Sequence, residues 1–470
     1  MVPQRYDAVV VGSGPNGLAA AVTLAEAGRG VLVLEGQDIP GGGLRSAELV
    51  EPGFRHDVCS TVMALASLSP FLKSRPLHLA LPDAPLAHPL DDGSAVVLER
   101  SVDATAATLG TDAAAYRRLI GPLTRHADAL FGDLMKPIGP TRHPLLMARF
   151  GLPALLPARR LAKLAFKGER ARALFAGVAG HSLLSLDQTV SASFGLVMLA
   201  SAHASGWPLA TGGSQEIARH LVKTLEAHGG EIECGRPVED LKSMPEHRAA
   251  FFDVPAESLA AIARERLPDR YRAKLARFRR GPGVFKLDWT LEAPIPWRAD
   301  GCARAGTVHL GGSLDEIAMS EHEVSRDRHS ERPFVILVQP TLFDATRAPQ
   351  GKHVAWAYCH VPNGSLRDMT GAIEAQVERF APGFKDVIRG RSKLNTKQLE
   401  SIEPNCLGGD ISGGGNNLLQ LLARPRPGAA AYSTPDPSLF LCSASTPPGG
   451  GIHGMCGMNA ADLALKRVLR

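Results

Sequence analysis

Hydrophobic and polar positions follow a regular order over the first part of the chain. Residues 7–11 (DAVVV) are β-branched or small and uncharged after the aspartate, which predicts a short buried strand of a parallel sheet. Apolar residues then recur at helical spacing over residues 18–25, and Gly28 ends the predicted helix. A second apolar run, residues 31–34 (VLVL), ends at Glu35. The pattern predicts a strand, a helix and a second parallel strand, which is the first unit of a Rossmann-like α/β sheet.

A glycine-rich turn joins the first predicted strand to the helix. It has the G-x-G-x-x-G spacing and consists of Gly12, Ser13, Gly14, Pro15, Asn16 and Gly17. Gly12 permits a tight turn, Gly14 lets the backbone approach a pyrophosphate, and Gly17 lets the helix pack on the strand. The helix N-terminus offers N–H groups to phosphates, and Glu35 can accept the hydroxyls of a ribose. We predict a dinucleotide site; a glycine-rich turn in another kind of α/β protein is the alternative.

Two later regions have different patterns. Residues of about 70–205 are rich in Leu, Ala and Arg and read as helices. Residues of about 265–420 contain apolar runs, such as residues 334–338 and 354–358, which read as strands of a second sheet. The chain therefore combines an N-terminal α/β unit with a second, mixed region of helices and strands.

Composition narrows the class of protein. Hydrophobic residues make up 44% and charged residues 21% of the 470 residues, which is ordinary for a globular protein of two or three domains. A net charge of +5 is too small for this length to indicate nucleic acid binding. The seven scattered cysteines form no C-x-x-C pair, which favours a reducing compartment over a disulfide framework or a zinc site. A strand begins almost at once and no apolar run is long enough to span a membrane, so we expect a cytoplasmic protein without a signal peptide.

A second glycine cluster follows the second predicted strand. Gly36 comes directly after Glu35, residues 39–46 read IPGGGLRS, and residues 53–61 read GFRHDVCST. This succession resembles the FAD-binding signature of the flavin amine-oxidase and phytoene-desaturase superfamily.

The resemblance implies where these residues lie relative to FAD. In that superfamily a glycine pair and an arginine run along the FAD diphosphate and ribityl chain, and they correspond here to Gly41, Gly42 and Arg45. Gly43 is an extra glycine in this stretch. The loop that corresponds to residues 59–61 passes close to the isoalloxazine ring.

The C-terminal region carries a further glycine-rich turn. Residues 439–445 (LFLCSAS) are an apolar strand pattern, residues 446–458 read TPPGGGIHGMCGM, and a helical pattern follows. The turn is similar to one in the phytoene-desaturase-like branch of the superfamily. The resemblance implies that the turn faces the pyrimidine edge of the flavin and that the helix start stabilises negative charge on the reduced ring.

Residues 206–264 resemble the segment in which the chain of superfamily members returns to the nucleotide domain. In those proteins the residue that matches Val238 contacts adenine through its backbone. The implied fold is α/β, with a Rossmann-like FAD-binding domain of the glutathione-reductase type and an α+β substrate-binding domain. The FAD-binding domain is assembled from residues 1–70, 206–264 and 421–470. The substrate domain has a helical part at residues 71–205 and a sheet part at residues 265–420.

The resemblance assigns non-covalent FAD binding to residues from all three segments. They are Gly12, Ser13, Gly14, Pro15, Asn16, Gly17, Glu35, Gly36, Gly41, Gly42, Gly43, Leu44, Arg45, Ser60, Thr61, Val238, Ser443, Gly450, Gly451 and His453. Cys59 and Cys456 belong to the same regions, but no resemblance supports a covalent link to the flavin.

Lys286 is the first candidate catalytic residue. It lies in a predicted strand, residues 283–291 (GVFKLDWTL), whose period of two places Lys286 and Asp288 on one face. Amine oxidases of the superfamily have a lysine on a comparable strand, bonded through water to flavin N5, and the resemblance implies the same role here. The alternative is an exposed lysine of the sheet that pairs with Asp288.

Histidines supply the other candidates. His453 lies inside the predicted flavin-facing turn, where it either contacts flavin or substrate as a catalytic residue or satisfies backbone carbonyls. His56 and Asp57 lie beside the predicted flavin loop, and we expect a structural role for His56. Three histidines isolated among apolar residues are expected to line the core or the pocket: His181, His203 and His360. None has the spacing of a metal ligand, so we predict no metal site.

Residues 143–167 (HPLLMARFGLPALLPARRLAKLAFK) combine apolar and basic residues and contain no acidic one. Such a segment is typical of a surface that rests on an anionic membrane. It can equally be a helical lid over an apolar tunnel, with a solvated basic outer face. Pro153 and Pro157 prevent one long helix.

The resemblance implies an FAD-dependent oxidoreductase that removes a hydride from a C–H bond, with oxygen or a quinone as electron acceptor. One form is a desaturase or dehydrogenase of a small, largely apolar organic substrate. The other is an amine oxidase that forms an imine; the absence of a tyrosine from the C-terminal turn disfavours it, whereas Lys286 favours it. A third alternative is a carrier of prenylated proteins that shares this architecture without using flavin, but its glycine motifs would be degraded. The oligomeric state is left open.

Overall fold

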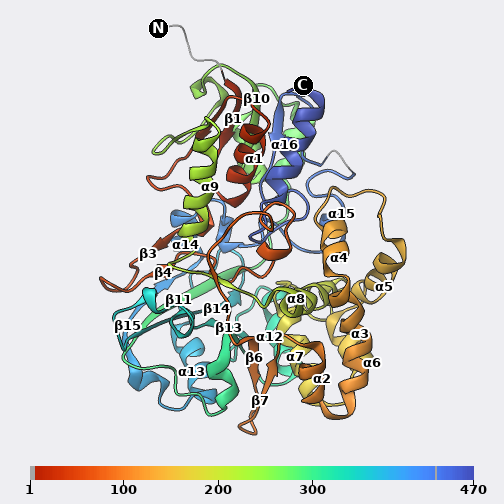
Figure 1. Ribbon diagram of the computed structural model, residues 1–470, viewed down its shortest axis with the longest axis vertical. Helices are drawn as coiled ribbons and strands as arrows, with labels where there is room; N and C mark the ends of the chain where they lie inside the picture. The colour runs from red at the N-terminus through yellow and green to blue at the C-terminus, as the bar shows by residue number, and fades with distance from the viewer. Residues whose placement is uncertain (1–5, 429–430) are drawn as a thin grey trace.

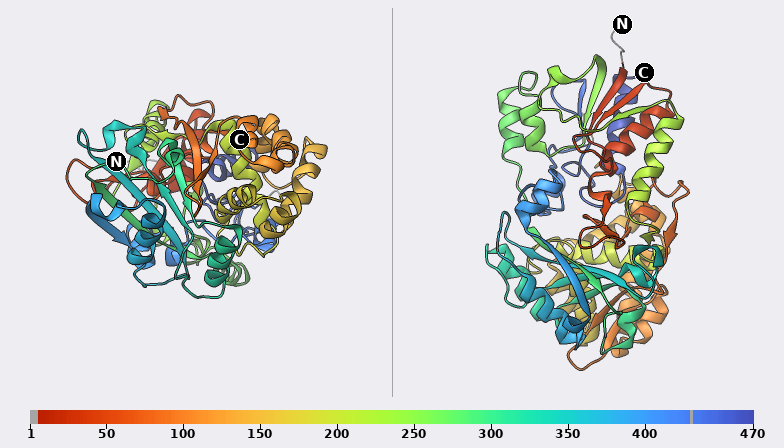
Figure 2. Two further views of the ribbon diagram at one scale, coloured as in Figure 1. Left: turned by 90° about the horizontal axis from the view of Figure 1, so that it is seen from below. Right: turned by 90° about the vertical axis from the view of Figure 1, so that its left-hand side faces the viewer.

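The computed structural model describes residues 6–428 and 431–470. Two main sheets organise this part of the chain, and they lie one above the other along the long axis of the molecule (Figure 1). The side view on the right of Figure 2 shows the same division. We call the region around the five-stranded sheet the upper body and the region around the seven-stranded sheet the lower body.

The upper sheet contains five parallel strands in the order β16-β10-β1-β2-β9. They are β1 (Tyr6–Val11), β2 (Val31–Leu34), β9 (Glu231–Glu233), β10 (His247–Phe252) and β16 (Leu439–Leu441). The predicted strands at residues 7–11 and 31–34 are confirmed as β1 and β2. The sheet therefore joins the beginning, the middle and the end of the chain.

Helices cover both faces of the upper sheet, which explains why its strands are apolar on both sides. Ala8 and Val10 of β1 belong to the core that also contains α1 (Pro15–Glu26), α9 (Gln215–Ala227) and α16 (Met455–Arg467). Val9 and Val11 belong to the core on the other face, with α10 (Ala256–Ile262) and α11 (Asp269–Ala276).

The helices α1 and α16 pack closely although they come from opposite ends of the chain (Figure 1). A Cβ on Gly457 of α16 would overlap the carbonyl oxygen of Asn16, and a Cβ on Gly454 would come within 2.9 Å of the Ala19 Cβ. Glycine at these two positions lets the helix backbones approach, and this approach brings the glycine-rich turns that precede the helices side by side.

The lower sheet contains seven strands in the order β15-β11-β14-β13-β12-β6-β7. They are β6 (Ala84–Pro89), β7 (Ala95–Leu98), β11 (Gly283–Leu291), β12 (Ala305–Leu310), β13 (Val335–Val338), β14 (His353–Val361) and β15 (Ile388–Leu394). All neighbouring strands are antiparallel except β12 and β6. The strands predicted at residues 283–291, 334–338 and 354–358 are confirmed as β11, β13 and β14.

The two faces of the lower sheet differ in chemistry. Phe285, Leu287 and Trp289 of β11 point into an apolar core that contains α13 (Thr370–Phe380). The intervening residues, among them Lys286 and Asp288, point to the opposite face, as the period of two predicted. We call that opposite face the polar face of the lower sheet.

Helices from the first half of the chain pack on part of the polar face (Figure 1). The series comprises α2 (Val102–Ala107), α3 (Ala113–Arg125), α4 (Ala127–Leu134), α5 (Pro144–Ala154), α6 (Ala158–Ala165), α7 (Glu169–Gly180) and α8 (Ser191–Ser205). The remaining elements are the helices α12 (Leu314–Ser325), α14 (Thr396–Ile402) and α15 (Leu418–Leu422), and two short ladders, β3 (Ser46–Ala47) with β4 (His56–Asp57) and β5 (Leu79–Ala80) with β8 (Leu209–Ala210).

The expectation that residues 71–205 are wholly helical is wrong at its start. The strands β5, β6 and β7 occupy residues 79–98, and β6 lies between β12 and β7 inside the lower sheet. Pro85 and Pro89 fall within β6, and proline is rare in central strands because it lacks the N–H that a ladder needs. The two prolines therefore made β6 unrecognisable as a strand in the sequence, although it pairs with β12 and β7 in the structure.

Candidate functional site

Three glycine-rich turns meet at one edge of the upper sheet. The strands β1, β10 and β16 are parallel neighbours, so the turns that follow β1 and β16 leave the sheet at the same edge. The third turn contains Gly41, with φ of +128°, and the 3-10 turn η1 (Gly42–Leu44). A Cβ on Gly42 would come within 3.0 Å of the Gly14 Cα, so this turn lies directly against the first. The three turns, each of which was predicted from the sequence to bind FAD, thus lie next to one another in the structure.

The turn between β1 and α1 depends on its glycines. Gly12 has φ of +93°, and a Cβ on Gly17 would overlap the carbonyl oxygen of Gly12. A Cβ on Gly14 would come within 2.6 Å of the Asp253 Oδ2. Asn16 in the first turn of α1 is buried, and its Oδ1 has no hydrogen-bond partner among the described residues.

Glu35 lies at the end of β2 and is buried beside this turn. The backbone N–H and the hydroxyl of Ser13 both donate to Glu35 Oε2, over 2.8 Å and 2.5 Å. The N–H of Gln37 donates to the other oxygen over 2.8 Å. The segment that contains Val238 runs alongside, because the Arg236 N–H donates to the Glu35 carbonyl over 2.8 Å and Gly36 lies against Pro237. The segment that contains Val238 therefore lies beside Glu35.

Two further acids and one cation lie at the same edge. Asp253, directly after β10, accepts a hydrogen bond from the Gly17 N–H over 2.8 Å. Burial, opposed by this hydrogen bond and reinforced by Glu403 and Glu35, raises the pKa of Asp253 to about 7. Arg45 lies 3.4 Å from Glu403 and also donates to the Ile402 carbonyl. Burial raises the pKa of Glu403, and Arg45 opposes this shift.

Sequence reasoning assigned no role to Asp253 or Glu403. A signal for Asp253 was present, since a carboxylate directly after an apolar strand of a parallel sheet lies at the edge where ligands bind. Glu403 follows α14, far along the chain, and only the tertiary structure brings it to Arg45.

The chemistry of this edge fits a dinucleotide. It combines the N-terminus of α1, glycines whose missing side chains leave room, and the guanidinium of Arg45. The unpartnered Oδ1 of Asn16 is a further polar group without a protein partner in the described part of the chain.

The turn between β16 and α16 contains His453, Ser443, Gly450 and Gly451. The Met455 N–H donates to the Nδ1 of the buried His453 over 3.0 Å, and its Nε2 lies 3.1 Å from the Gly449 carbonyl oxygen. This arrangement requires the proton on Nε2, and burial lowers the pKa of His453 to about 4. Both ring nitrogens thus engage the backbone of the turn, which favours the backbone-satisfying interpretation of this residue over the catalytic one.

Arg424 is a buried cation behind this turn. Its Nε donates to the Ala444 carbonyl over 2.9 Å and its Nη2 donates to the Ser412 carbonyl over 2.7 Å. Burial lowers the pKa of Arg424 to about 10, although the nearby Asp410 acts in the opposite direction. The hydrogen bonds of this guanidinium go to carbonyl oxygens beside the glycine-rich turn.

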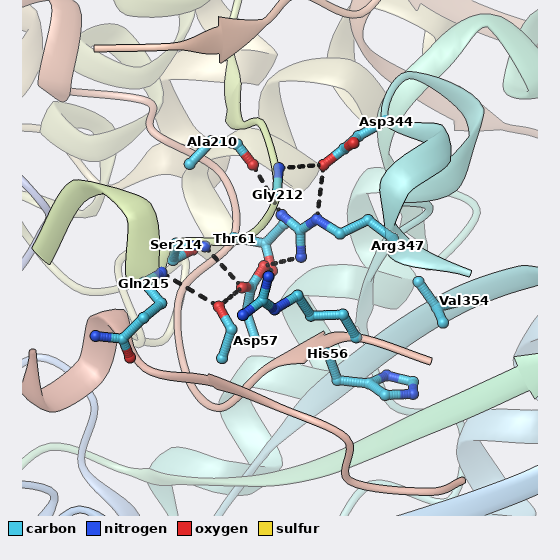
Figure 3. A network of polar contacts seen from close by, with 12 residues as sticks. His56, Asp57, Thr61, Ala210, Gly212, Ser214, Gln215, Asp344, Arg347 and Val354 are labelled. Carbon is cyan, nitrogen blue, oxygen red and sulfur yellow. Dashed lines mark hydrogen bonds and ion pairs between the residues drawn. The ribbon is translucent and has the colours of Figure 1, made fainter. Parts of the chain in front are cut away.

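A buried network around Arg347 connects the β3–β4 hairpin with the segment of residues 210–215 and with Asp344 (Figure 3). The Arg347 Nη1 donates to Asp57 Oδ2 over 2.9 Å, the Nε donates to Asp344 over 2.8 Å, and the Nη2 donates to the Ala210 carbonyl over 3.0 Å. Burial works against the charge of Arg347, but Asp57 and Asp344 outweigh it and raise the pKa of the guanidinium. No pattern in the sequence indicated a role for Arg347, because nothing in its neighbourhood along the chain points to Asp57.

Asp57 also fixes the predicted flavin loop. It accepts hydrogen bonds from the hydroxyl of Thr61 over 2.7 Å and from the backbone N–H of Ser214 over 2.9 Å. The Trp356 Nε1 in turn donates to Thr61 over 2.8 Å. Ser60 donates its N–H to the Gly43 carbonyl over 3.2 Å, which ties this loop to the second glycine cluster.

Lys286 lies on the polar face, in the second strand from the edge of the lower sheet, and is only 3% exposed. The alternative of an exposed lysine is therefore wrong, although the pairing with Asp288 is correct. The Nζ lies 2.5 Å from Asp288 Oδ2 and 5.1 Å from the ring centroid of Trp356. Burial opposes ionisation of Asp288, but Lys286 and His56 outweigh it and lower the pKa of Asp288.

His56 completes this buried group. Its Nδ1 lies 3.4 Å from Asp288 Oδ1, and neither ring nitrogen makes a hydrogen bond to a described residue. In Figure 3 its ring points away from the Arg347 network. The adjacent residues His56 and Asp57 thus serve two different networks, one around Lys286 and one around Arg347.

The three isolated histidines are buried or partly buried and have partners. His203 contacts the hydroxyl of Tyr116 over 2.7 Å, and His360 contacts Glu321 over 2.7 Å. His181 lies 2.9 Å from the Nε2 of His309, and burial lowers the pKa of His181 to about 3. His203 belongs to α8, His181 follows α7, and His360 lies on β14 of the lower sheet. Among the residues that the structure describes, no group of three or more His, Cys, Asp or Glu could hold a metal ion.

The basic segment forms two helices, α5 and α6. Leu145 and Leu152 of α5 are 87% and 73% exposed, whereas Leu161 of α6 is buried against the helical layer. Arg159 and Lys163 pair with Asp315 of α12, which the sequence did not foresee. None of the helices in the described ranges is long and apolar enough to cross a membrane.

Comparison with known proteins places these features in context. Residues 10–73 match the family model described as an NAD(P)-binding Rossmann-like domain. The chain is 25% identical to the pyridine nucleotide-disulfide oxidoreductase domain-containing protein 2 of Rattus norvegicus, over 98% of this chain and 94% of that protein. It is 26% identical to a phytoene dehydrogenase of Streptomyces griseus, over 76% of this chain and 73% of that protein.

A solved structure of putrescine oxidase bound to putrescine has the same overall fold. It covers 99% of this chain and 100% of its own, with a TM-score of 0.65 and 18% sequence identity. This likeness shows that the two proteins share a fold.

Replacing Arg347 by methionine should lower the free energy of unfolding by about 3–5 kcal/mol, because two buried carboxylates lose their shared cation. Arg391→Met is the matched control, since the Arg391 side chain is 45% exposed in its pair with Glu374 and should change the free energy by about 1 kcal/mol or less. Urea unfolding of both variants measures the difference. Equal effects of the two substitutions would contradict the role assigned to Arg347.

Proposed function

We propose that the chain is a phytoene-desaturase-like oxidoreductase that uses non-covalent FAD to remove a hydride from a C–H bond of a small, largely apolar organic substrate. The likeness to a phytoene dehydrogenase, the Rossmann-like match at residues 10–73 and the shared fold with putrescine oxidase support the proposal. The observation that carries the proposal is the meeting of the three glycine-rich turns at one edge, above a sheet face that presents Lys286. When bound, FAD supplies the two-electron acceptor for the hydride.

The residues that would hold FAD come from all three segments. Gly12, Gly14 and Gly17 would admit the diphosphate at the start of α1, and Glu35 lies where a ribose acceptor is needed. The segment from Gly41 to Arg45 would continue the cradle. The turn at residues 449–454 adds backbone N–H groups and the start of α16, to which a reduced flavin could present negative charge.

The surroundings of Lys286 support an apolar substrate. Val284, Leu183 and Cys59 form one small apolar cluster with Tyr358 beside Lys286, and Trp356 and Tyr358 stack with centroids 5.8 Å apart. The Asp288 carboxylate already neutralises the Lys286 ammonium. The side chains around Lys286 therefore include few groups that would bind a charged substrate strongly.

An amine oxidase is the second candidate. The fold likeness to putrescine oxidase and the buried Lys286 favour it. The Asp288 carboxylate is, however, already paired with Lys286 and is not free to bind a protonated amine. The two candidates differ in their electron acceptor, since an amine oxidase would use oxygen to reoxidise the flavin.

Air reoxidation of the photoreduced protein distinguishes the two candidates. The desaturase proposal predicts slow return of the oxidised flavin absorption bands in air and faster return when a quinone is added. Rapid return in air would contradict it and would support the amine oxidase. The measurement requires no knowledge of the substrate.

Lys286→Met should leave FAD bound, because Lys286 lies on the lower sheet outside the glycine cradle, but should slow turnover about 100-fold or more, as expected for loss of a proton-transfer or water-polarising group. The rate of flavin reduction by substrate under anaerobic conditions measures this effect. Lys393→Met is the matched control, because Lys393 is an exposed lysine of the neighbouring strand.

A double variant, Lys286→Met with Asp288→Asn, guards against misfolding, because it leaves no unpaired carboxylate in the sheet. Turnover that is unchanged in a folded, FAD-bound variant would contradict a catalytic role for Lys286.

The exposed leucines of α5 are consistent with an apolar substrate, because such a substrate dissolves in membranes and these leucines could contact one. We propose that α5 rests on an anionic membrane, from which such a substrate could be drawn, while α6 covers the helical layer. Leu145→Glu with Leu152→Glu should reduce co-sedimentation with vesicles that contain anionic phospholipid by several-fold. Leu366→Glu is the control, because this leucine is 61% exposed in a loop of the lower body. Equal binding by the two variants would contradict the proposal.

A further inference from the structure

A carboxyl group lies inside the glycine cradle itself. Asp253 is only 4% exposed and accepts the Gly17 N–H, one of the groups that a helix N-terminus offers to an anion. Its Oδ2 lies so close to Gly14 that a Cβ there would come within 2.6 Å. The glycine that the motif reserves for close approach to a pyrophosphate is thus also approached by this carboxyl group.

Other acidic groups at this edge add to the negative charge near the expected pyrophosphate site. Glu35 at the end of β2 and Glu403 after α14 both act electrostatically on Asp253. Arg45 lies nearby but is committed to Glu403 and to the Ile402 carbonyl. Two thiols complete the surroundings, Cys442 after β16 and Cys456 at the start of α16, and burial raises the pKa of both, with a smaller contribution from Asp253. Among the described residues named here, Asp253, Glu35 and Glu403 are acids and Arg45 is a cation, so negative charge predominates where a dianionic diphosphate would bind.

We propose that Asp253 takes up a proton from solvent when FAD binds, so that a neutral carboxyl group, and not a carboxylate, shares the N-terminus of α1 with the diphosphate. The inference rests on the proposed function only in that FAD is the ligand. It makes Asp253 a positioning residue of the cofactor site and makes affinity for FAD dependent on pH.

The chemistry of the two protonation states gives the direction. A carboxylate can only accept hydrogen bonds and would repel a phosphate, whereas a neutral carboxyl group has an O–H that can donate to a phosphate oxygen. A bound dianion therefore favours the protonated form. If Asp253 served only as an acceptor for the Gly17 N–H, it could stay ionised when FAD binds, and no proton would be taken up. An amide oxygen at this position could then replace the carboxylate.

Burial already brings the pKa of Asp253 to about 7 before any anion is present. Protonation is therefore accessible near neutral pH, and a diphosphate would raise this pKa further. Because the folded pKa is raised, the contribution of Asp253 to stability of the cofactor-free protein is present at low pH and is lost as pH rises through about 7. By the same linkage the Kd for FAD should increase about tenfold between pH 6 and pH 8.

The test is titration of the cofactor-free, full-length protein with FAD by calorimetry. At pH 8 the measurement is repeated in two buffers with different heats of ionisation, so that the number of protons taken up per FAD is obtained directly. Asp253→Asn keeps an acceptor for the Gly17 N–H and removes the titrating group. Glu239→Gln removes one negative charge from an exposed position of the same body and is the matched control.

The inference predicts uptake of close to one proton per FAD at pH 8 by the natural protein and the Glu239→Gln variant, and little or none by Asp253→Asn. The Kd of Asp253→Asn should also lose most of its dependence on pH. Proton uptake by Asp253→Asn equal to that of the natural protein, or a Kd of the natural protein that does not change between pH 6 and pH 8, would overturn it. If none of the proteins binds FAD at either pH, the proposed function itself is wrong, which is a different result.

Discussion

The guanidinium of Arg347 joins the β3–β4 hairpin to the connection between β13 and β14 of the lower sheet. It is completely buried and is held by Asp57 of β4 and by Asp344 of that connection. A buried charge of this kind is tolerated only when its partners are held in place, so the ion pairs fix the position of the β3–β4 hairpin relative to the lower sheet. The loop from Asp57 to Thr61 and the segment around Ser214 inherit that position through their hydrogen bonds to Asp57.

The ion pairs of Arg347 also determine which side chains lie together on the polar face of the lower sheet. The adjacent residue His56 is brought to Asp288 on the polar face, and Asp288 in turn holds Lys286. The upper body contributes an edge lined with glycines, and the lower body contributes a face with one buried lysine. Neither half contains both features. The proposed chemistry therefore depends on a contact that lies outside the cofactor motifs.

The sequence predicted the parts of the molecule that are encoded locally. The strands β1, β2, β11, β13 and β14 follow from runs of apolar residues, and the glycine-rich turns follow from spacing that only a tight turn or a close approach requires. The polar face of β11 follows from a period of two. These features depend on neighbours in the chain, and such neighbours are visible in a sequence.

Other features depend on partners that are distant in the chain. The strand β6 was hidden by two prolines and is defined by its pairing with β12 and β7. Arg347 and Glu403 acquire their environments only when separate segments meet, and no local pattern distinguishes them from surface charges. The burial of Lys286 is of the same kind, because alternation gives the face of a strand but not what covers that face.

The amount of FAD retained by the protein tests the central claim most directly. Full-length protein is incubated with FAD, separated from free cofactor by gel filtration, and analysed by absorption and by chromatography of the cofactor released on denaturation. The account predicts one FAD per chain, released intact because it is held without a covalent bond. A protein that retains no flavin, or retains a nicotinamide dinucleotide in its place, would contradict the account.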